Sequence, residues 1–359
     1  MSGETGPRGR DSRGRDSRGR DSRGRDSRGR DSRGRDSRGA DSPRPGGGKR
    51  PGGNRRGEKQ LVPEAEFRSY YGRPVVKETV WGPDIPSYLF LGGLAGASST
   101  LAAGAQLTGR PELARALKCG AAGAISLSMV ALVHDLGRRT RFLNMLRVLK
   151  VTSPMSIGTW ILSGYTPLAL AAAASAVTRK MPRGGLAATI ATGLLGPAVA
   201  SYTAVLLGDT AAPAWHEAHR ELPFLFAGSA ATAAGGLGML TVRPGRAGQA
   251  IRFAVLGAAG EIAAKSLLLQ RLGPAAEPYQ TGRAGQLMDI SEVLTSAGLA
   301  VAVLAGRTRV GAPLAGLALM AASALMRFGV FEAGRASARD PKYTVVPQRE
   351  HLKDARPES

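Results

Sequence analysis

The sequence predicts an all-α integral membrane protein, a bundle of about eight transmembrane helices with a disordered N-terminal tail. From Tyr88 onward the chain breaks into apolar stretches of about twenty residues, the length that spans a hydrocarbon core about 30 Å thick. Short segments rich in Arg, Pro and Gly separate these stretches. The first sixty residues, in contrast, contain almost no apolar side chains. The chain therefore joins a polar tail to a membrane domain.

Residues 1–60 form the predicted tail. They contain the repeat Arg-Gly-Arg-Asp-Ser, from about Arg8 to Arg38, and carry 19 Lys+Arg against 9 Asp+Glu, whereas the rest of the chain has 30 against 18. Such a segment cannot offset the entropy lost on ordering, so we expect disorder. Its charge suits non-specific contact with anionic lipid or nucleic acid. A solvated tail without a specific partner is the simpler interpretation.

The remaining chain divides into three parts. Residues 61–87 form a juxtamembrane segment, residues 88–335 the transmembrane domain, and residues 336–359 a polar C-terminal tail. The predicted spans are 88–107, 113–133, 155–177, 186–207, 222–242, 249–269, 285–305 and 312–333. Loops such as 179–183 and 243–246 combine Arg, Pro and Gly, which favour turns and are too polar for lipid.

The first span carries small residues at four-residue spacing, namely Gly92, Gly96, Thr100 and Gly104. Residues at this spacing lie on one face of a helix, and small side chains let helix backbones approach closely. We therefore expect this face to pack against neighbouring helices and not against lipid.

An even number of spans places both termini on one side of the membrane, here called the terminal face. All tryptophans and histidines fall at or near it: Trp81, Trp160, Trp215, His134, His216, His219 and His351. Aromatic belts normally occupy both interfaces, so this bias indicates a functional surface. Fourteen Lys and Arg residues lie near the terminal face and eight in the opposite loops. The positive-inside rule then predicts a multi-pass cell-membrane protein with cytoplasmic termini.

Ionisable residues within membrane spans are costly and mark candidate functional groups. The later spans carry five: Glu261, Lys265, Asp289, Glu292 and Arg327. Glu261 and Lys265 have the spacing of an intrahelical ion pair. These groups could form a proton path, since quinone chemistry needs titratable carriers. They could instead be buried pairs that hold helices in register, Glu261 with Lys265 and Arg327 with Asp289 or Glu292.

Several types of site receive no support from the sequence. The single cysteine, Cys119, cannot supply the four ligands of an iron–sulfur cluster, so any cluster must belong to a partner. Apart from His134 at the end of the second span, no histidine lies within a span, which argues against haem. We find no metal motif, no Gly-rich phosphate loop and no residues for substrate catalysis by this chain alone. We therefore do not expect this chain to catalyse substrate chemistry on its own, and any enzymatic activity would belong to a complex with partner subunits.

Several segments together resemble the NrfD/PsrC family, the membrane subunits of polysulfide reductase, nitrite reductase and related molybdenum or iron–sulfur oxidoreductases. The resemblance covers residues 75 to 335 approximately, and the combination of motifs over the first five spans is specific. The segments that carry it are Trp81–Pro86 with Tyr88–Gly93, Asp135–Arg138, Arg141–Phe142, Asn144–Arg147, Ser153–Ser156 with Gly158 and Trp160, Tyr202–Leu207 with Pro213 and Trp215, and Leu222–Phe226.

The resemblance implies a menaquinone or menaquinol site near the surface where an iron–sulfur, ferredoxin-like subunit docks, and through it a molybdenum-type catalytic subunit. Tyr202 would hydrogen-bond a quinone oxygen, and Trp81, Asp84 and Tyr88 would line the same site. His134 and Asp135 fall on the same polar face by their position in the chain. The expected function is therefore quinone binding and electron transfer to or from that partner.

Two other functions remain open. A scaffold could anchor an iron–sulfur enzyme in the membrane without binding quinone. An ion or solute transporter could use the buried charges, and it would be expected to show related halves and helices interrupted at the midplane. The two sets of four spans show no convincing relation to each other.

Overall fold

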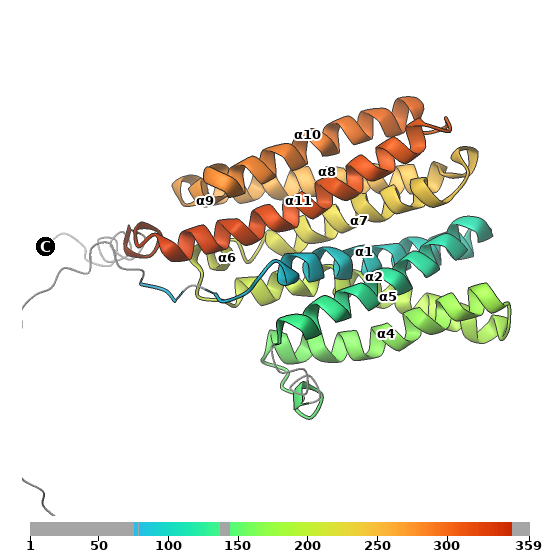
Figure 1. The fold of residues 1–359 in the computed structure, drawn as a ribbon, viewed down its shortest axis with the longest axis horizontal. Helices are drawn as coiled ribbons and strands as arrows, with labels where there is room; N and C mark the ends of the chain where they lie inside the picture. The colour runs from blue at the N-terminus through green and yellow to red at the C-terminus, as the bar shows by residue number, and fades with distance from the viewer. Residues whose placement is uncertain (1–74, 78, 137–143, 347–359) are drawn as a thin grey trace, which may run out of the picture. The chain divides into compact units, whose positions relative to one another are not determined.

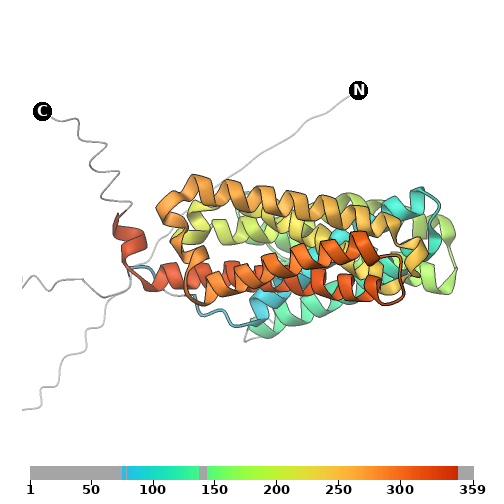
Figure 2. The ribbon, with the colours of Figure 1, turned by 90° about the horizontal axis from the view of Figure 1, so that it is seen from above.

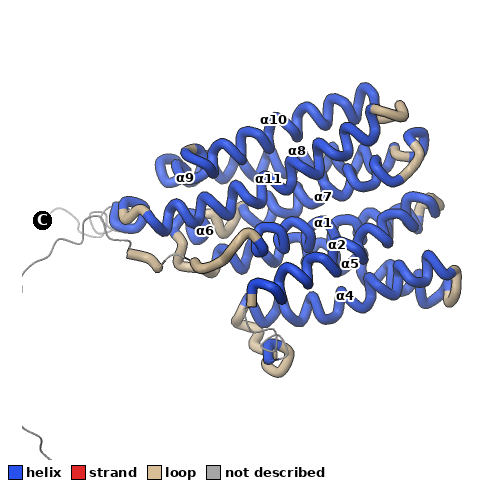
Figure 3. Tube along the Cα trace, viewed as in Figure 1, coloured by secondary structure: helices blue, strands red, loops and turns tan. Residues whose placement is uncertain are grey.

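The computed structural model describes residues 75–77, 79–136 and 144–346. The predicted tail at residues 1–60, His351, most of the C-terminal tail and the motif residues Arg138 and Phe142 lie outside the described residues. Within the described ranges the secondary structure is helical, with no strand (Figure 3). Eight helices are long and apolar enough to cross a membrane. The predicted all-α membrane fold is thus confirmed.

The eight long helices are α1 (Asp84–Leu107), α2 (Pro111–Asp135), α4 (Pro154–Thr178), α5 (Pro182–Gly208), α7 (Leu222–Thr241), α8 (Gly248–Leu272), α10 (Gly282–Ala305) and α11 (Gly311–Arg339). The short helices are α6 (Pro213–Glu217), α9 (Glu277–Gln280), η1 (Pro244–Arg246) and η2 (Gly273–Ala276). Proline opens α2, α4 and α5. At this position its missing N–H costs nothing, because the first N–H groups of a helix have no partner within it.

The long helices form two groups of four (Figures 1 and 2). The first contains α1, α2, α4 and α5, and the second contains α7, α8, α10 and α11. The groups meet mainly where α1 and α5 pack against α7 and where α1 packs against α11. The α6 and α9 helices lie at the terminal face, beside the C-terminal end of α11. These contacts between helices hold the candidate residues in place.

The small-residue face of α1 packs as predicted. A Cβ atom at Gly96 would overlap the carbonyl of Gly196 in α5, and a Cβ atom at Gly196 would overlap that of Gly96. The hydroxyl of Thr100 donates to the carbonyl of Gly193 at 3.2 Å. Gly92 lies against Ser128 of α2. In a membrane such close backbone approach supplies much of the packing energy, because lipid gives helices no hydrophobic reason to associate.

Candidate functional site

A cavity of about 120 Å³ lies at the terminal face of the first helix group. The segment before α1, the N-terminal turns of α1 and α4 and the C-terminal ends of α2 and α5 surround it. Its lining includes four of the six predicted quinone-binding residues, namely Trp81, Tyr88, Asp135 and Tyr202. The rest of the lining is mostly apolar, with Ile85, Leu89, Leu132, Leu162, Leu206, Leu207 and the methionines Met145 and Met155. The structure thus brings together residues more than a hundred positions apart.

Two tyrosines on the wall of this cavity, Tyr88 and Tyr202, form a hydrogen-bonded pair through their hydroxyls. Tyr88 is only 3% exposed, and its backbone carbonyl accepts a hydrogen bond from the hydroxyl of Ser128 at 3.1 Å. The ring of Tyr202 lies against Gly158, where a Cβ atom would overlap it. A phenol held this way can donate to one acceptor in a fixed position.

Asp84 and His134 lie beside the cavity but do not line it. Asp84 opens α1 and His134 lies in the last turn of α2, and the Nδ1 atom of His134 is 2.8 Å from a carboxylate oxygen of Asp84. The His134 side chain is 69% exposed. Asp135 does line the cavity, and among the described residues it has no hydrogen bond or ion pair. The predicted set therefore divides into a cavity group and an exposed pair.

The tryptophans have different roles despite their shared face. Trp81 lines the cavity and stacks on Trp215, with ring centroids 6.0 Å apart. Trp215 is fully buried, and its indole N–H donates to the carbonyl of Val330 at 2.7 Å. Trp160 is 43% exposed on α4. Only Trp81 therefore belongs to the cavity, while Trp215 joins α6 to α11.

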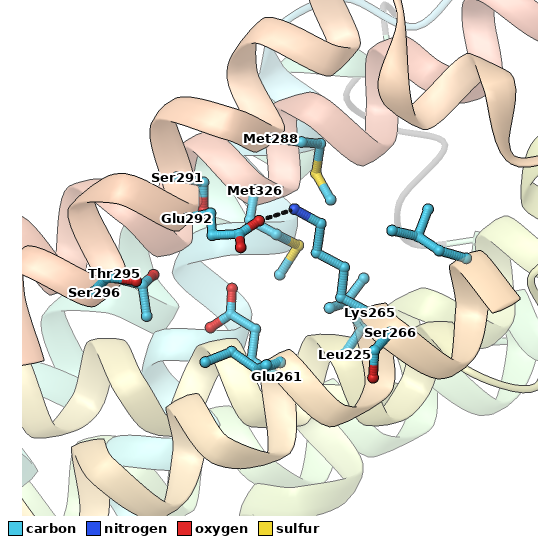
Figure 4. A pocket seen from close by; sticks show the side chains of 12 residues that line it. Leu225, Glu261, Lys265, Ser266, Met288, Ser291, Glu292, Thr295, Ser296 and Met326 are labelled. Carbon is cyan, nitrogen blue, oxygen red and sulfur yellow. Dashed lines mark hydrogen bonds and ion pairs between the residues drawn. The ribbon is translucent and has the colours of Figure 1, made fainter.

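A second cavity, of about 150 Å³, lies between α8 and α10 (Figure 4). Three of the five predicted membrane charges line it: Glu261, Lys265 and Glu292. The Lys265 ammonium pairs with Glu292 of α10 at 2.5 Å. The expected intrahelical pairing of Lys265 with Glu261 is therefore replaced by a pair between helices, because Lys265 points toward α10. Glu261 is 7% exposed, points into the cavity, and its Oε2 atom has no hydrogen-bond partner among the described residues.

The other two predicted charges lie outside this cavity. Arg327 is fully buried in α11, where it donates to the carbonyl of Phe226 at 2.7 Å and covers the Phe226 ring at 3.8 Å. It forms no ion pair within the described part of the chain, so its suggested pairing with Asp289 or Glu292 is not observed. Asp289 is exposed on the outer side of α10. Arg327 therefore joins α11 to α7, while its Nε and Nη1 atoms have no hydrogen-bond partner among the described residues.

Sequence reasoning missed several residues that shape these cavities. Ser291 and Thr295 of α10 line the second cavity, and the Ser291 hydroxyl donates to the carbonyl of Ala322 at 2.8 Å. Gly158 was expected only as part of a family motif, and its role is to shape the first cavity by leaving room for a ring from another helix. A helical pattern of small and polar residues gives no sign of which ring or cavity it will face, so no local signal could have identified them.

Comparison with known proteins agrees with this geometry. The family model described as polysulphide reductase, NrfD matches residues 75–253, which includes the whole first helix group and the first cavity. Among curated proteins, none matches the chain. With eight helices among the described residues that are long and apolar enough to cross a membrane, and with this match over about half of its length, the chain belongs to the polysulphide reductase NrfD family and is a multi-pass membrane protein.

Proposed function

We propose that the chain is the quinone-binding membrane subunit of a multisubunit oxidoreductase, which passes electrons between the menaquinone/menaquinol pool and an iron–sulfur partner. The observation that carries the proposal is the hydrogen-bonded pair of Tyr88 and Tyr202 on the wall of the terminal-face cavity. NrfD-family subunits are associated with quinone interaction and pair with iron–sulfur and catalytic subunits. The partner here would be ferredoxin-like, with a molybdenum-type catalytic subunit beyond it.

The residues of the cavity fit a quinone head group. At about 120 Å³ the cavity is smaller than the apolar cavity of about 150 Å³ that holds benzene, so it would receive one edge of the naphthoquinone head group and would have to widen to enclose the whole of it. The isoprenoid tail would remain on the lipid side. Phenol hydroxyls are suitable donors to quinone carbonyl oxygens, and apolar walls suit the ring. A bound quinone would supply coupled electron and proton transfer.

The chain's own residues would hold the head group and move protons. The Tyr202 hydroxyl donates to a carbonyl oxygen, and Tyr88 keeps that hydroxyl in position. Asp135, whose carboxylate has no partner among the described residues, accepts or returns a proton at its carboxylate oxygen. Trp81 closes the apolar wall. The exposed pair of Asp84 and His134 exchanges protons with water at the terminal face.

The second cavity would carry protons within the membrane. Glu261 points into it with an unpartnered oxygen, and the pair of Lys265 and Glu292 lines the same space. Glu261→Gln is expected to slow proton uptake during quinone reduction by the assembled complex and to leave quinone-analogue affinity unchanged. Asp289→Asn is the matched control, because Asp289 lies outside the cavity. Equal proton uptake in the parent and in Glu261→Gln would rule out this role.

The test of quinone binding is fluorescence quenching by a menaquinol analogue in the purified subunit. Tyr202→Phe is expected to weaken binding about fivefold, the loss of roughly one net hydrogen bond. Tyr343→Phe is the control, because Tyr343 lies at the terminal face outside this cavity. An analogue that fails to bind the parent, even with the partner present, would leave a scaffold or an ion or solute transporter as the function.

A further inference from the structure

A pocket of about 430 Å³ lies at the membrane face opposite to the terminal face. The N-terminal turns of α2 and α5 and the C-terminal end of α4 form it. Three basic side chains line it, Arg115, Lys118 and Arg179, with Glu112 as the one acidic residue. Glu112 forms an ion pair with Arg246, so its charge is already compensated. The pocket therefore has an excess of positive charge.

Lys118 gives this pocket a buried cation. Lys118 lies in the third turn of α2 and is only 8% exposed. The ammonium donates to the side-chain oxygen of Gln106 at 3.0 Å, and among the described residues no carboxylate pairs with it. An ammonium has three donors, and a neutral amide does not balance its charge. A buried cation at membrane depth is costly without an anion, so the pocket is suited to an anionic group.

The basic side chains, and not the helix ends, give the pocket its positive charge. Both α2 and α5 begin here, but the C-terminal end of α4 meets the same pocket, so the positive ends of two helices are opposed by the negative end of a third. The turn between α4 and α5 is strained, with φ of 58° at Arg179 and 51° at Met181. The Ser175 hydroxyl donates to the carbonyl of Lys180 at 3.0 Å and fixes this turn. Arg179 is thereby kept on the pocket wall.

An apolar strip leads away from the pocket along α5. Leu186 lines the pocket itself, and Ile190 and Leu194 follow it at four-residue spacing. Their exposed fractions are 40%, 38% and 77%, so the strip is open to the outside of the helix group. A ligand with both an anionic group and long hydrocarbon chains would contact the cations and this strip together. Free phosphate would contact only the cations.

We propose that this pocket binds the phosphate group of an anionic phospholipid. Lys118 and Arg115 contact the phosphate, Arg179 covers it from the strained turn, and an acyl chain runs along the strip that starts at Leu186. Basic pockets between transmembrane helices are suitable sites for anionic lipid head groups. The site is independent of the quinone proposal, because it lies at the other membrane face.

The test measures the thermal midpoint of the purified full-length chain in a neutral detergent. The chain is titrated with phosphatidylglycerol, phosphatidylcholine or inorganic phosphate. Phosphatidylglycerol is expected to raise the midpoint in a saturable way, because a ligand that binds only the folded state stabilises it. Phosphatidylcholine is expected to have little effect, and inorganic phosphate to act only at much higher concentration. Equal effects of the two lipids, or of phosphate and phosphatidylglycerol, would overturn the proposal.

Matched variants locate the effect. Arg115→Gln is expected to weaken phosphatidylglycerol binding about fivefold, the contribution of one basic side chain near an anionic lipid. Arg183→Gln makes the same charge change in the first turn of α5, outside the pocket lining, and is expected to change little. Lys118→Gln should weaken binding further. If that variant does not fold, the affinity of Arg115→Gln still tests the pocket, because Arg115 is exposed and its replacement should not affect folding. Identical lipid affinity in Arg115→Gln and Arg183→Gln would show that the pocket is not the site.

Discussion

The position of the Tyr202 hydroxyl depends on a residue without a side chain. Gly158 of α4 lies against the Tyr202 ring, and a methyl group there would overlap two ring atoms. The ring would have to rotate or the helices separate, and either change would move the hydroxyl away from Tyr88. Gly158 therefore positions Tyr202, and it also lines the cavity.

Replacing Gly158 by Ala should consequently weaken quinone-analogue binding. The expected loss is about five- to tenfold, since roughly one well-placed hydrogen bond is disturbed. Gly164→Ala, in the same helix, is the control, because no atom lies within 4 Å of a Cβ atom built there. Fluorescence quenching compares the three proteins. Similar affinities for the two variants would mean that the Tyr202 position is unimportant for binding.

A second residue-scale feature is the ion pair of Glu221 and Arg271. The Nε atom of Arg271 donates to one carboxylate oxygen of Glu221 at 2.6 Å, and the Nη2 atom of Arg271 donates to the other at 2.7 Å. These hydrogen bonds lower the pKa of Glu221 below its ordinary value of 4.5. Since Glu221 precedes α7 and Arg271 lies in the last turn of α8, the pair links two helices at the terminal face.

This pair predicts a pH dependence of stability. Because the pKa of Glu221 is lower in the folded state, its contribution is complete above its unfolded pKa and is lost as the pH falls through the lower folded value. The thermal midpoint of the parent should therefore decrease when the pH is lowered below about 4.5. In Arg271→Gln this part of the decrease should be smaller. Parallel curves for the two proteins, measured by thermal unfolding, would exclude a contribution from the pair.

The sequence could predict only part of the site at this scale. Trp81, Tyr88, Asp135 and Tyr202 share a cavity because each lies at, or directly before, the terminal-face end of a helix, which chain position and the family resemblance both indicate. The partner of Lys265 could not be predicted in this way. Glu261 is its neighbour at i,i+4 spacing, but the rotation of α8 relative to α10 decides which carboxylate it reaches, and sequence spacing does not specify that rotation.

At the scale of helices, the contact of α1 with α5 depends on reciprocal glycines. Gly96 and Gly196 each lie against the backbone carbonyl of the other, so neither helix can carry a side chain at this crossing. Gly196→Val would force the helices apart or bend them. Overpacking of this kind typically costs about 1–3 kcal/mol.

The expected result is a lower thermal midpoint for Gly196→Val in detergent. Gly123→Val, in α2, adds the same side chain where no atom lies within 4 Å, and should keep the parent midpoint. Since α1 also carries Tyr88 and α5 carries Tyr202, quinone-analogue binding should weaken in Gly196→Val alone. Unchanged stability in that variant would show that the crossing tolerates separation.

Helix existence was easier to predict than helix ends. All eight predicted spans correspond to observed helices, because twenty apolar residues leave few alternatives in lipid. The ends differ where a helix continues into polar sequence. The first predicted span starts at residue 88, whereas α1 starts at Asp84, and the last ends at residue 333, whereas α11 ends at Arg339. Hydropathy indicates which residues lie in the membrane, but the backbone hydrogen bonds of α11 continue beyond the predicted span through residues such as Arg335 and Arg339.

At the scale of the whole membrane domain, the candidate functions are spatially separated. The proposed quinone cavity belongs to the first helix group at the terminal face, the second cavity lies between α8 and α10 of the second group, and the pocket lined by Arg115, Lys118 and Arg179 opens at the opposite face. A sequence gives the order of the helices but not which of them enclose a cavity together. The separation means that each proposal can be tested by variants that leave the other two sites intact.

The orientation of the terminal face decides where the partner subunit must be. Eight spans place both ends of the domain on one side, and the excess of Lys and Arg in the segments near that side predicts that it is cytoplasmic. A green fluorescent protein fused to the C-terminus should then fluoresce, and an alkaline phosphatase fused there should be inactive. Fusions in the loop after α4 should give the opposite results. If phosphatase is active at the C-terminus, the quinone cavity faces outward, and an iron–sulfur subunit that reaches it must be exported across the membrane.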